Sequence, residues 1–163
     1  MNKFFAILKK YSKILFTVYV VFLILVIVLK FPTGMVRNMV QGWFDGQEVV
    51  RMSPQMIPFK TIIEYAGNVH SLNDWFIKNL MANVIMFIPY GFLVPFFAQK
   101  DRRVLIKVVL TGCTLSIFIE VFQYVTALGQ CDVDDVILNT LGVLLGGCIY
   151  QLIYLFVQKS NGK

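Results

Sequence analysis

Long apolar stretches alternate with short charged gaps along the chain. Each stretch is near or above the roughly 17–25 residues that a helix needs to cross the hydrocarbon core of a bilayer. The stretches do not alternate between apolar and polar residues as barrel strands do, and the run Phe22–Leu29 is apolar throughout. Because a backbone in lipid must satisfy its own hydrogen bonds, the pattern predicts four transmembrane helices, at residues 14–30, 81–98, 104–128 and 136–157.

The first stretch follows basic residues, as the apolar core of a signal peptide does. It is long, however, and it closes with Lys30-Phe31-Pro32 in place of a small-residue cleavage site. We therefore expect an uncleaved anchor. The predicted fold class is an all-α membrane protein, a single membrane domain over residues 1–163, in which a bundle of about four helices carries an external segment between the first and second.

That external segment, residues 31–80, is too long for a bare connection and is expected to have its own structure. Val36, Met39, Val40 and Trp43 recur at helical spacing, which predicts an amphipathic helix lying in the outer membrane interface. The segment also holds His70, the single histidine of the chain, so a zinc site is not expected.

The charges agree with a membrane protein and indicate its orientation. Apolar residues make up 58% of the chain and charged residues 15%, against about a quarter in soluble domains. Basic residues resist translocation and gather on the cytoplasmic side. If both termini are cytoplasmic, that side holds ten of the fifteen basic residues: Lys3, Lys9, Lys10, Lys13, Lys100, Arg102, Arg103, Lys107, Lys159 and Lys163. The net charge of +6 is therefore interpreted as a topology signal, and no nucleic-acid partner is expected.

Polar side chains form stripes at membrane depth, where they are costly and indicate function. In the third predicted helix, Glu120 lies one turn beyond a serine and one turn before a glutamine, roughly 12 Å below the outer end of the helix. The neighbouring helices add polar stripes that start from the same side. We therefore predict a polar binding pocket open to the outer leaflet, formed by Asn83, Ser116, Glu120, Gln123, Asp132, Asp135 and Asn139.

Several of these residues also have structural explanations. Asp132, with Asp135 three residues later, resembles a helix N-cap followed by an acid in the first turn. Buried asparagines can hold helices together by hydrogen bonds, and Gly142-x-x-x-Gly146 is typical of close helix packing. Glu120 is the hardest to explain as structure and is the candidate catalytic residue, if the site is catalytic.

Two kinds of chemistry remain open at this stage. Glu120, Asp132 and Asp135 together could hold a divalent cation, which would engage a lipid phosphate or activate water. Alternatively, Glu120 could act as a general acid or base. The chain shows neither a nucleophile paired with a base nor a glycine-rich phosphate loop. Enzyme activity is therefore left open, and a binding protein is favoured.

Four segments resemble motifs of the VanZ-like family, in the same order along the chain. They are the P-F-x-T element at Pro58–Thr61, N-x-x-x-F-x-P-x-G at Asn83–Gly91, S-x-x-x-E-x-x-Q at Ser116–Gln123, and D-x-x-D-x-x-x-N-T-x-G at Asp132–Gly142. The resemblance covers roughly residues 57–150. The chain departs from many relatives at Gln130, where they carry an arginine before the aspartate block.

The resemblance implies a small multi-pass protein of a bacterial plasma membrane, because the family's name member is associated with resistance to the acylated glycopeptide teicoplanin. The first hypothesis is a binding protein that holds a membrane lipid, a lipid-linked cell-wall precursor or teicoplanin in an outer-leaflet pocket. The alternative is an intramembrane enzyme, metal-dependent or acid/base, that modifies an envelope lipid or precursor.

Overall fold

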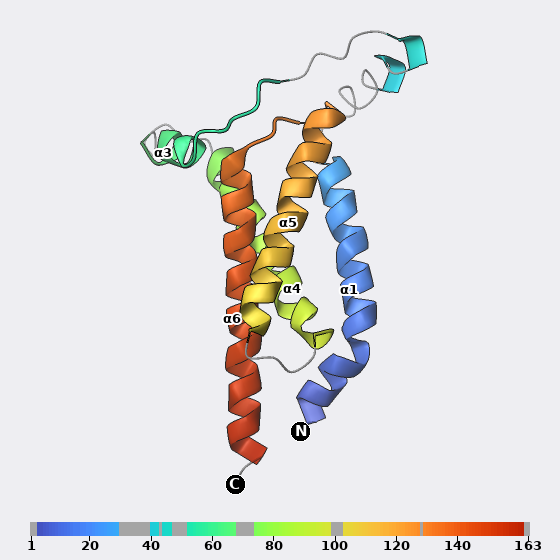
Figure 1. The fold of residues 1–163 in the computed structure, drawn as a ribbon, viewed down its shortest axis with the longest axis vertical. Helices are drawn as coiled ribbons and strands as arrows, with labels where there is room; N and C mark the ends of the chain where they lie inside the picture. The colour runs from blue at the N-terminus through green and yellow to red at the C-terminus, as the bar shows by residue number, and fades with distance from the viewer. Residues whose placement is uncertain are drawn as a thin grey trace.

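The computed structural model describes residues 3–29, 40–42, 44–46, 52–67, 74–98, 103–127 and 129–161. Its elements are the helices α1 (Lys3–Leu29), α3 (Lys60–Gly67), α4 (Asp74–Leu93), α5 (Val104–Val125) and α6 (Val133–Asn161), with a short 3-10 helix η1 (Val94–Phe96) directly after α4. Four long helices form an up-and-down bundle, and the first turn of α1 lies at the same end as the last turn of α6 (Figure 1). The predicted all-α membrane fold is confirmed.

Three helices of the described chain are long and apolar enough to cross a membrane alone: Phe5–Ile27, Val104–Val125 and Val133–Lys159. The remaining member of the bundle, α4, contributes a shorter apolar stretch, Leu80–Phe96. Helix α4 continues past Pro89 to Leu93, and Pro95 lies in the 3-10 helix that follows it. The four expected apolar stretches are thus all helical, and one of them is too short to count as a candidate span by itself.

The centre of the bundle is the contact between α4 and α6, which approach at backbone distance. At Gly146 a β-carbon would lie 2.0 Å from the carbonyl oxygen of Ile88, and at Gly142 it would lie 2.1 Å from that of Val84. Only hydrogen fits in these positions. The Gly142-x-x-x-Gly146 stripe therefore packs within the bundle, against α4.

Helix α1 is more loosely attached, and it contacts α4 along one side. Its Tyr19 hydroxyl donates a hydrogen bond to the Met86 carbonyl oxygen of α4 at 3.1 Å. Near the chain termini, Phe5 packs between aromatic rings, with centroids 5.2 Å from Phe96 and 5.8 Å from Tyr150. This contact lies in the part of α1 that precedes the predicted apolar stretch starting at residue 14.

The segment of residues 31–80, which lies mostly between α1 and α4, is described in part. The interfacial helix expected from Val36, Met39, Val40 and Trp43 falls mostly outside the described residues, as does His70. Residues 52–67 are described, and they lie across the end of the bundle where α6 begins (Figure 1). This part of the segment belongs to the architecture of the site described next.

Candidate functional site

The turn between α5 and α6 places Asp132 as the N-cap of α6. Its carboxylate oxygen Oδ1 accepts the backbone N–H of Asp134 at 2.9 Å, which satisfies a donor that the helix itself leaves unpaired. The second oxygen, Oδ2, accepts the hydroxyl of Thr61 at 2.8 Å. The helix-cap interpretation of Asp132 is therefore confirmed, and the same carboxylate also connects α6 to the segment of residues 52–67.

Backbone hydrogen bonds also attach the segment of residues 52–67 to this turn. Gln55 donates to the Cys131 carbonyl oxygen at 2.8 Å and accepts from the Val133 N–H at 3.0 Å, an isolated parallel bridge. Gln130 donates from Nε2 to the Ser53 carbonyl oxygen at 2.8 Å. A glutamine at this position thus serves to hold the segment in place.

The side chain of Asp134 also attaches the segment of residues 52–67 to α6. It is fully buried, and it accepts the backbone N–H groups of Phe59 at 2.5 Å and Ile62 at 3.2 Å. These amides lie at the start of α3, so Asp134 caps α3 from another part of the chain and complements the positive end of its dipole. Phe59 has a φ of +63°, a left-handed conformation that turns the chain into α3.

Next to this cap, side chains of α1, α4, α5 and α6 line a small polar cavity of about 50 Å³. Its polar lining comes from five of the residues singled out by the sequence, and α1 closes one side with apolar side chains. The polar residues are Asn83 of α4, Glu120 and Gln123 of α5, and Asp135 and Asn139 of α6; the apolar ones are Leu23, Val26, Ile27, Met86, Phe87 and Ile119.

Hydrogen bonds connect the residues that line the cavity with one another and with neighbouring residues. Glu120, which is 3% exposed, accepts the backbone N–H of Asp132 at 3.1 Å, so the cavity and the cap share a contact. Asn83 donates from Nδ2 to Oδ1 of Asp135. Asn139 donates from Nδ2 to the hydroxyl oxygen of Ser116 at 2.8 Å, but its own Oδ1 is buried without a hydrogen-bond partner. An unpaired buried acceptor is costly, and it marks a place where a ligand donor would be stabilised.

The structure thus brings the seven predicted site residues to one end of the bundle, but not all of them line the cavity. Five of them line the cavity. Ser116 accepts a hydrogen bond from Asn139 and does not itself line the cavity. Asp132 belongs to the cap, and its backbone N–H donates to Glu120, which lines the cavity. Whether these residues bind a ligand stays a prediction. Sequence reasoning missed Asp134, whose role as a cap depends on backbone amides 72 and 75 residues away.

The shared divalent cation has no support from the arrangement of side chains. Among the residues that the structure describes, no group of three or more histidine, cysteine, aspartate or glutamate side chains is placed to hold a metal ion. Asp132 uses both of its oxygens in the cap, and Asp135 and Glu120 face the cavity together with amide groups. The cavity is better described as a mixed carboxyl and amide pocket.

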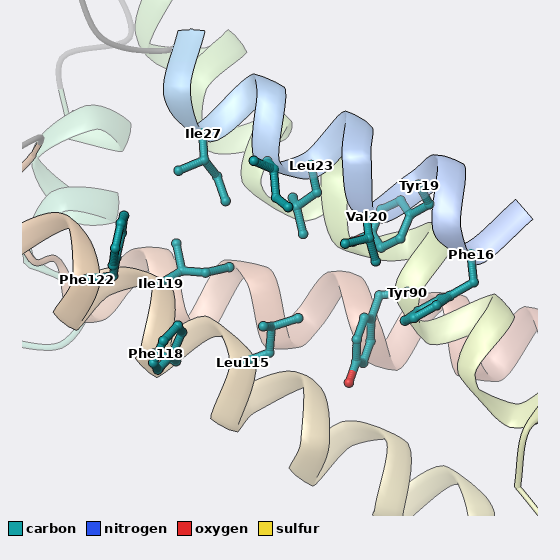
Figure 2. Close-up of a pocket in the computed structure, with 11 residues that line it drawn as sticks. Phe16, Tyr19, Val20, Leu23, Ile27, Tyr90, Leu115, Phe118, Ile119 and Phe122 are labelled. Carbon is teal, nitrogen blue, oxygen red and sulfur yellow. The ribbon is translucent and has the colours of Figure 1, made fainter. Parts of the chain in front are cut away.

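A larger apolar groove of about 550 Å³ lies between α1 and α5, next to the polar cavity. Figure 2 shows its side chains facing one another from the two helices, with Tyr90 of α4 at one end. Outward-facing members of the wall are well exposed, 54% for Ile24 and 67% for Phe118. A groove of this kind in a membrane-spanning bundle opens to lipid.

The turn carries a thiol that can report on the charge of the site. Burial raises the pKa of the Cys131 thiol, and the carboxyl groups of Glu120 and Asp132 raise it further because negative charge opposes the thiolate. Only the thiolate reacts with alkylating reagents. We therefore expect Glu120→Gln to lower the Cys131 pKa, so that maleimide labelling at neutral pH becomes faster and the rate-against-pH curve moves to lower pH.

The measurement needs Cys131 as the sole thiol, with Cys113→Ala and Cys148→Ala in every variant. Glu64→Gln is the matched control, because it also removes an acid but Glu64 is not among the groups that act on this thiol. Equal labelling profiles for Glu120→Gln and the parent would show that Glu120 carries no charge felt at the turn.

These features define a class, a helical membrane protein that holds a polar cavity beside an apolar groove. The sequence profile of the VanZ/LLP1 family matches residues 16–154, and the chain belongs to that family. Over 81 residues it is 36% identical to Protein VanZ of Enterococcus faecium, a match that covers 46% of this chain and 45% of that protein. The match therefore spans less than half of the curated relative. No solved structure matches the chain.

Proposed function

We propose that this protein works in the plasma membrane of a bacterium as a binding protein for an amphiphile of the outer leaflet, and that this binding contributes to low-level resistance to teicoplanin. The VanZ/LLP1 family assignment supports this proposal, together with the similarity to Protein VanZ. The ligand would be a membrane lipid, a lipid-linked cell-wall precursor or the acylated glycopeptide itself.

The observation on which the proposal rests is that the polar cavity and the apolar groove lie next to each other. The polar cavity of about 50 Å³ adjoins an apolar groove of about 550 Å³, and an amphiphile needs both kinds of surface. An engineered cavity of about 150 Å³ accommodates benzene. A space of about 50 Å³ therefore accepts a small terminal group of a headgroup, and a whole sugar or peptide would remain outside it.

The orientation that suits this role has both termini in the cytoplasm and the cap formed by residues 52–67 on the outer side. The distribution of basic residues supports it, because they concentrate near the chain termini and in the connection between α4 and α5. In that orientation the polar cavity lies in the outer half of the bilayer. A ligand held there would be withdrawn from the surface at which an acylated glycopeptide anchors.

The test is drug susceptibility in a susceptible Gram-positive host that expresses the chain. Wild type should raise the minimal inhibitory concentration of teicoplanin, with little effect on a glycopeptide that has no acyl chain. Glu120→Gln and Asp135→Asn should each lose most of the increase. Each variant weakens a hydrogen bond to a charged group, worth about 1.5–3 kcal/mol or about ten- to a hundred-fold in affinity.

Asp45→Asn is the control, because Asp45 is an exposed acid that does not line the cavity. Membrane levels of all variants are measured by immunoblotting. Full resistance in both cavity variants would contradict the proposal. A modified lipid or precursor in extracts of wild-type cells, absent from Glu120→Gln cells, would replace binding by the enzyme alternative.

A further inference from the structure

The segment of residues 52–67 carries large apolar side chains that the bundle leaves uncovered. Its exposed fractions at these positions lie between 50% and 65%. We call these residues the apolar patch: Met52, Met56, Ile57, Phe59 and Ile63. Apolar side chains gathered on a surface in this way mark a contact with lipid or with protein. The surroundings of the patch decide between the two.

Hydrogen bonds fix the depth of the patch relative to the membrane. The backbone N–H groups of Phe59 and Ile62 donate to the carboxylate of Asp134, which lies in the first turn of α6. The candidate span Val133–Lys159 has 27 residues, and a helix of this length extends over about 40 Å. A bilayer including its headgroups is about 40–45 Å thick, so the first turn of α6 lies in a headgroup layer. The patch therefore lies in that layer as well.

Helix α3 also lies to the side of the bundle at this level. Figure 1 shows it beside the start of α6, on the side away from α1. An element in this position lies over lipid. The side chains of α3 are distributed accordingly: Thr61 and Ile62 are half-buried, Ile63 is exposed and apolar, and Lys60 and Glu64 are exposed and charged. Helices with one apolar and one charged side settle in the membrane interface, with the apolar side towards the acyl chains.

Phe59 provides a second observation. Its φ of +63° lies in the left-handed region, where glycine fits without strain and a bulky side chain does not. Its side chain is about half exposed, so packing within the protein gives only part of the reason for an aromatic residue at this strained position. Contact with lipid supplies the rest, because aromatic rings are stabilised at the boundary between headgroups and acyl chains.

We propose that the apolar patch inserts into the headgroup layer and anchors residues 52–67 to the membrane surface beside the bundle. The partner is a lipid surface because the patch lies at the level of the end of α6 and continues its apolar surface, on which Leu141 and Leu144 are exposed. Through Asp134, the anchored segment is held over the end of the bundle at which the polar cavity lies. This inference goes beyond the proposed function, and its test needs no ligand.

The test is tryptophan fluorescence of the full-length chain in vesicles of phosphatidylcholine and phosphatidylglycerol. The two native tryptophans, Trp43 and Trp75, are replaced by phenylalanine, and one new tryptophan is introduced as Phe59→Trp or Ile63→Trp. Lipids brominated near the headgroup should quench both new tryptophans strongly, and lipids brominated at the chain end should quench them weakly. The emission of both should lie at shorter wavelength than that of tryptophan in water.

Two further tryptophan positions calibrate the measurement. Lys60→Trp is the matched control, because Lys60 is an exposed position on the charged side of α3, and it should be quenched much less. Phe118→Trp is the depth reference, because Phe118 is exposed within the candidate span of α5 and should respond most to bromine at the chain end. Unfolding temperatures in detergent show that each variant is folded.

A second measurement asks whether the patch holds the segment in place. Met56→Ser combined with Ile57→Ser removes two patch residues and leaves α3 unchanged. Hydrogen exchange at the Phe59 and Ile62 amides in vesicles should then become about five- to ten-fold faster, since partial burial of a large apolar side chain contributes roughly this factor. Lys60→Ser is the control and should leave these rates nearly unchanged.

Three outcomes would overturn the inference. The first is patch tryptophans that are not quenched and emit as in water. The second is short-wavelength emission without quenching by bromine, because another part of the chain or a second copy would then cover the patch. The third is equal quenching at Lys60, which would mean that the patch is not the part that enters lipid. None of these outcomes changes the result expected for the cavity variants in the resistance assay, so the proposed function is tested separately.

Discussion

Gly146→Ala is expected to prevent the normal packing of α4 against α6 and to leave little folded protein. The added β-carbon would lie 2.0 Å from the Ile88 carbonyl oxygen and 2.8 Å from the Phe92 nitrogen, both backbone atoms that cannot rotate away. Overpacking typically costs 1–3 kcal/mol, and rigid neighbours place this variant at about the upper limit. Thermal unfolding in detergent and the yield of monodisperse protein measure the effect.

The adjacent glycine provides the control. At Gly147 a β-carbon would lie 2.6 Å from Cδ1 of Leu105, the end of a flexible side chain, and 3.8 Å from the nearest backbone atom outside its own helix. Gly147→Ala should therefore be tolerated with a much smaller loss of stability. Equal unfolding temperatures for the two variants would mean that α4 and α6 are further apart than described.

The second large effect is expected from Asp134→Ala, which should release residues 52–67 from the end of the bundle. Asp134 is fully buried, and its carboxylate accepts the N–H groups of Phe59 and Ile62. Hydrogen bonds to a charged group contribute about 1.5–3 kcal/mol each, so the loss should be about 3 kcal/mol or more. Hydrogen exchange at these two amides should accelerate, and trypsin should cleave after Lys60.

Asp134→Asn distinguishes the contribution of charge from that of geometry. The amide keeps one acceptor oxygen in the same place, so it should retain one of the two hydrogen bonds and part of the protection. Asp45→Ala serves as the neutral control at an exposed acid. If Asp134→Ala leaves the exchange of Phe59 and Ile62 unchanged, then the bridge at Gln55 holds the segment without the buried carboxylate.

The membrane helices could be predicted from the sequence because the signal is local. A long run of apolar residues has to form its own backbone hydrogen bonds in lipid, whatever lies next to it. The ends of the helices were less predictable. Helix α1 extends to Lys3, well before the predicted stretch, and Phe5 there packs against Phe96 and Tyr150, which are far away in sequence. A run of apolar residues carries no information about such partners.

The candidate site was partly predictable for a similar reason. Glu120, Asn139 and Asp135 stand out because a polar residue at membrane depth has a cost that can be recognised in the sequence alone. The residues of α1 that close the cavity, such as Leu23 and Ile27, do not stand out, because they are ordinary members of an apolar stretch. Their role depends on the place of α1 beside α4 and α5.

The sequence by itself determined that this protein is an all-α membrane protein of the VanZ-like type with polar residues on three of its helices. Helical periodicity and the cost of polar groups in lipid are properties of single segments, so no partner is needed to recognise them. Only the tertiary structure decided that Asp132 and Asp134 hold the segment of residues 52–67, while Asp135 faces the cavity with Glu120. Adjacent acids differ in this way because their partners come from Phe59, Thr61 and Asn83, and contacts across such distances in sequence arise only when the helices pack.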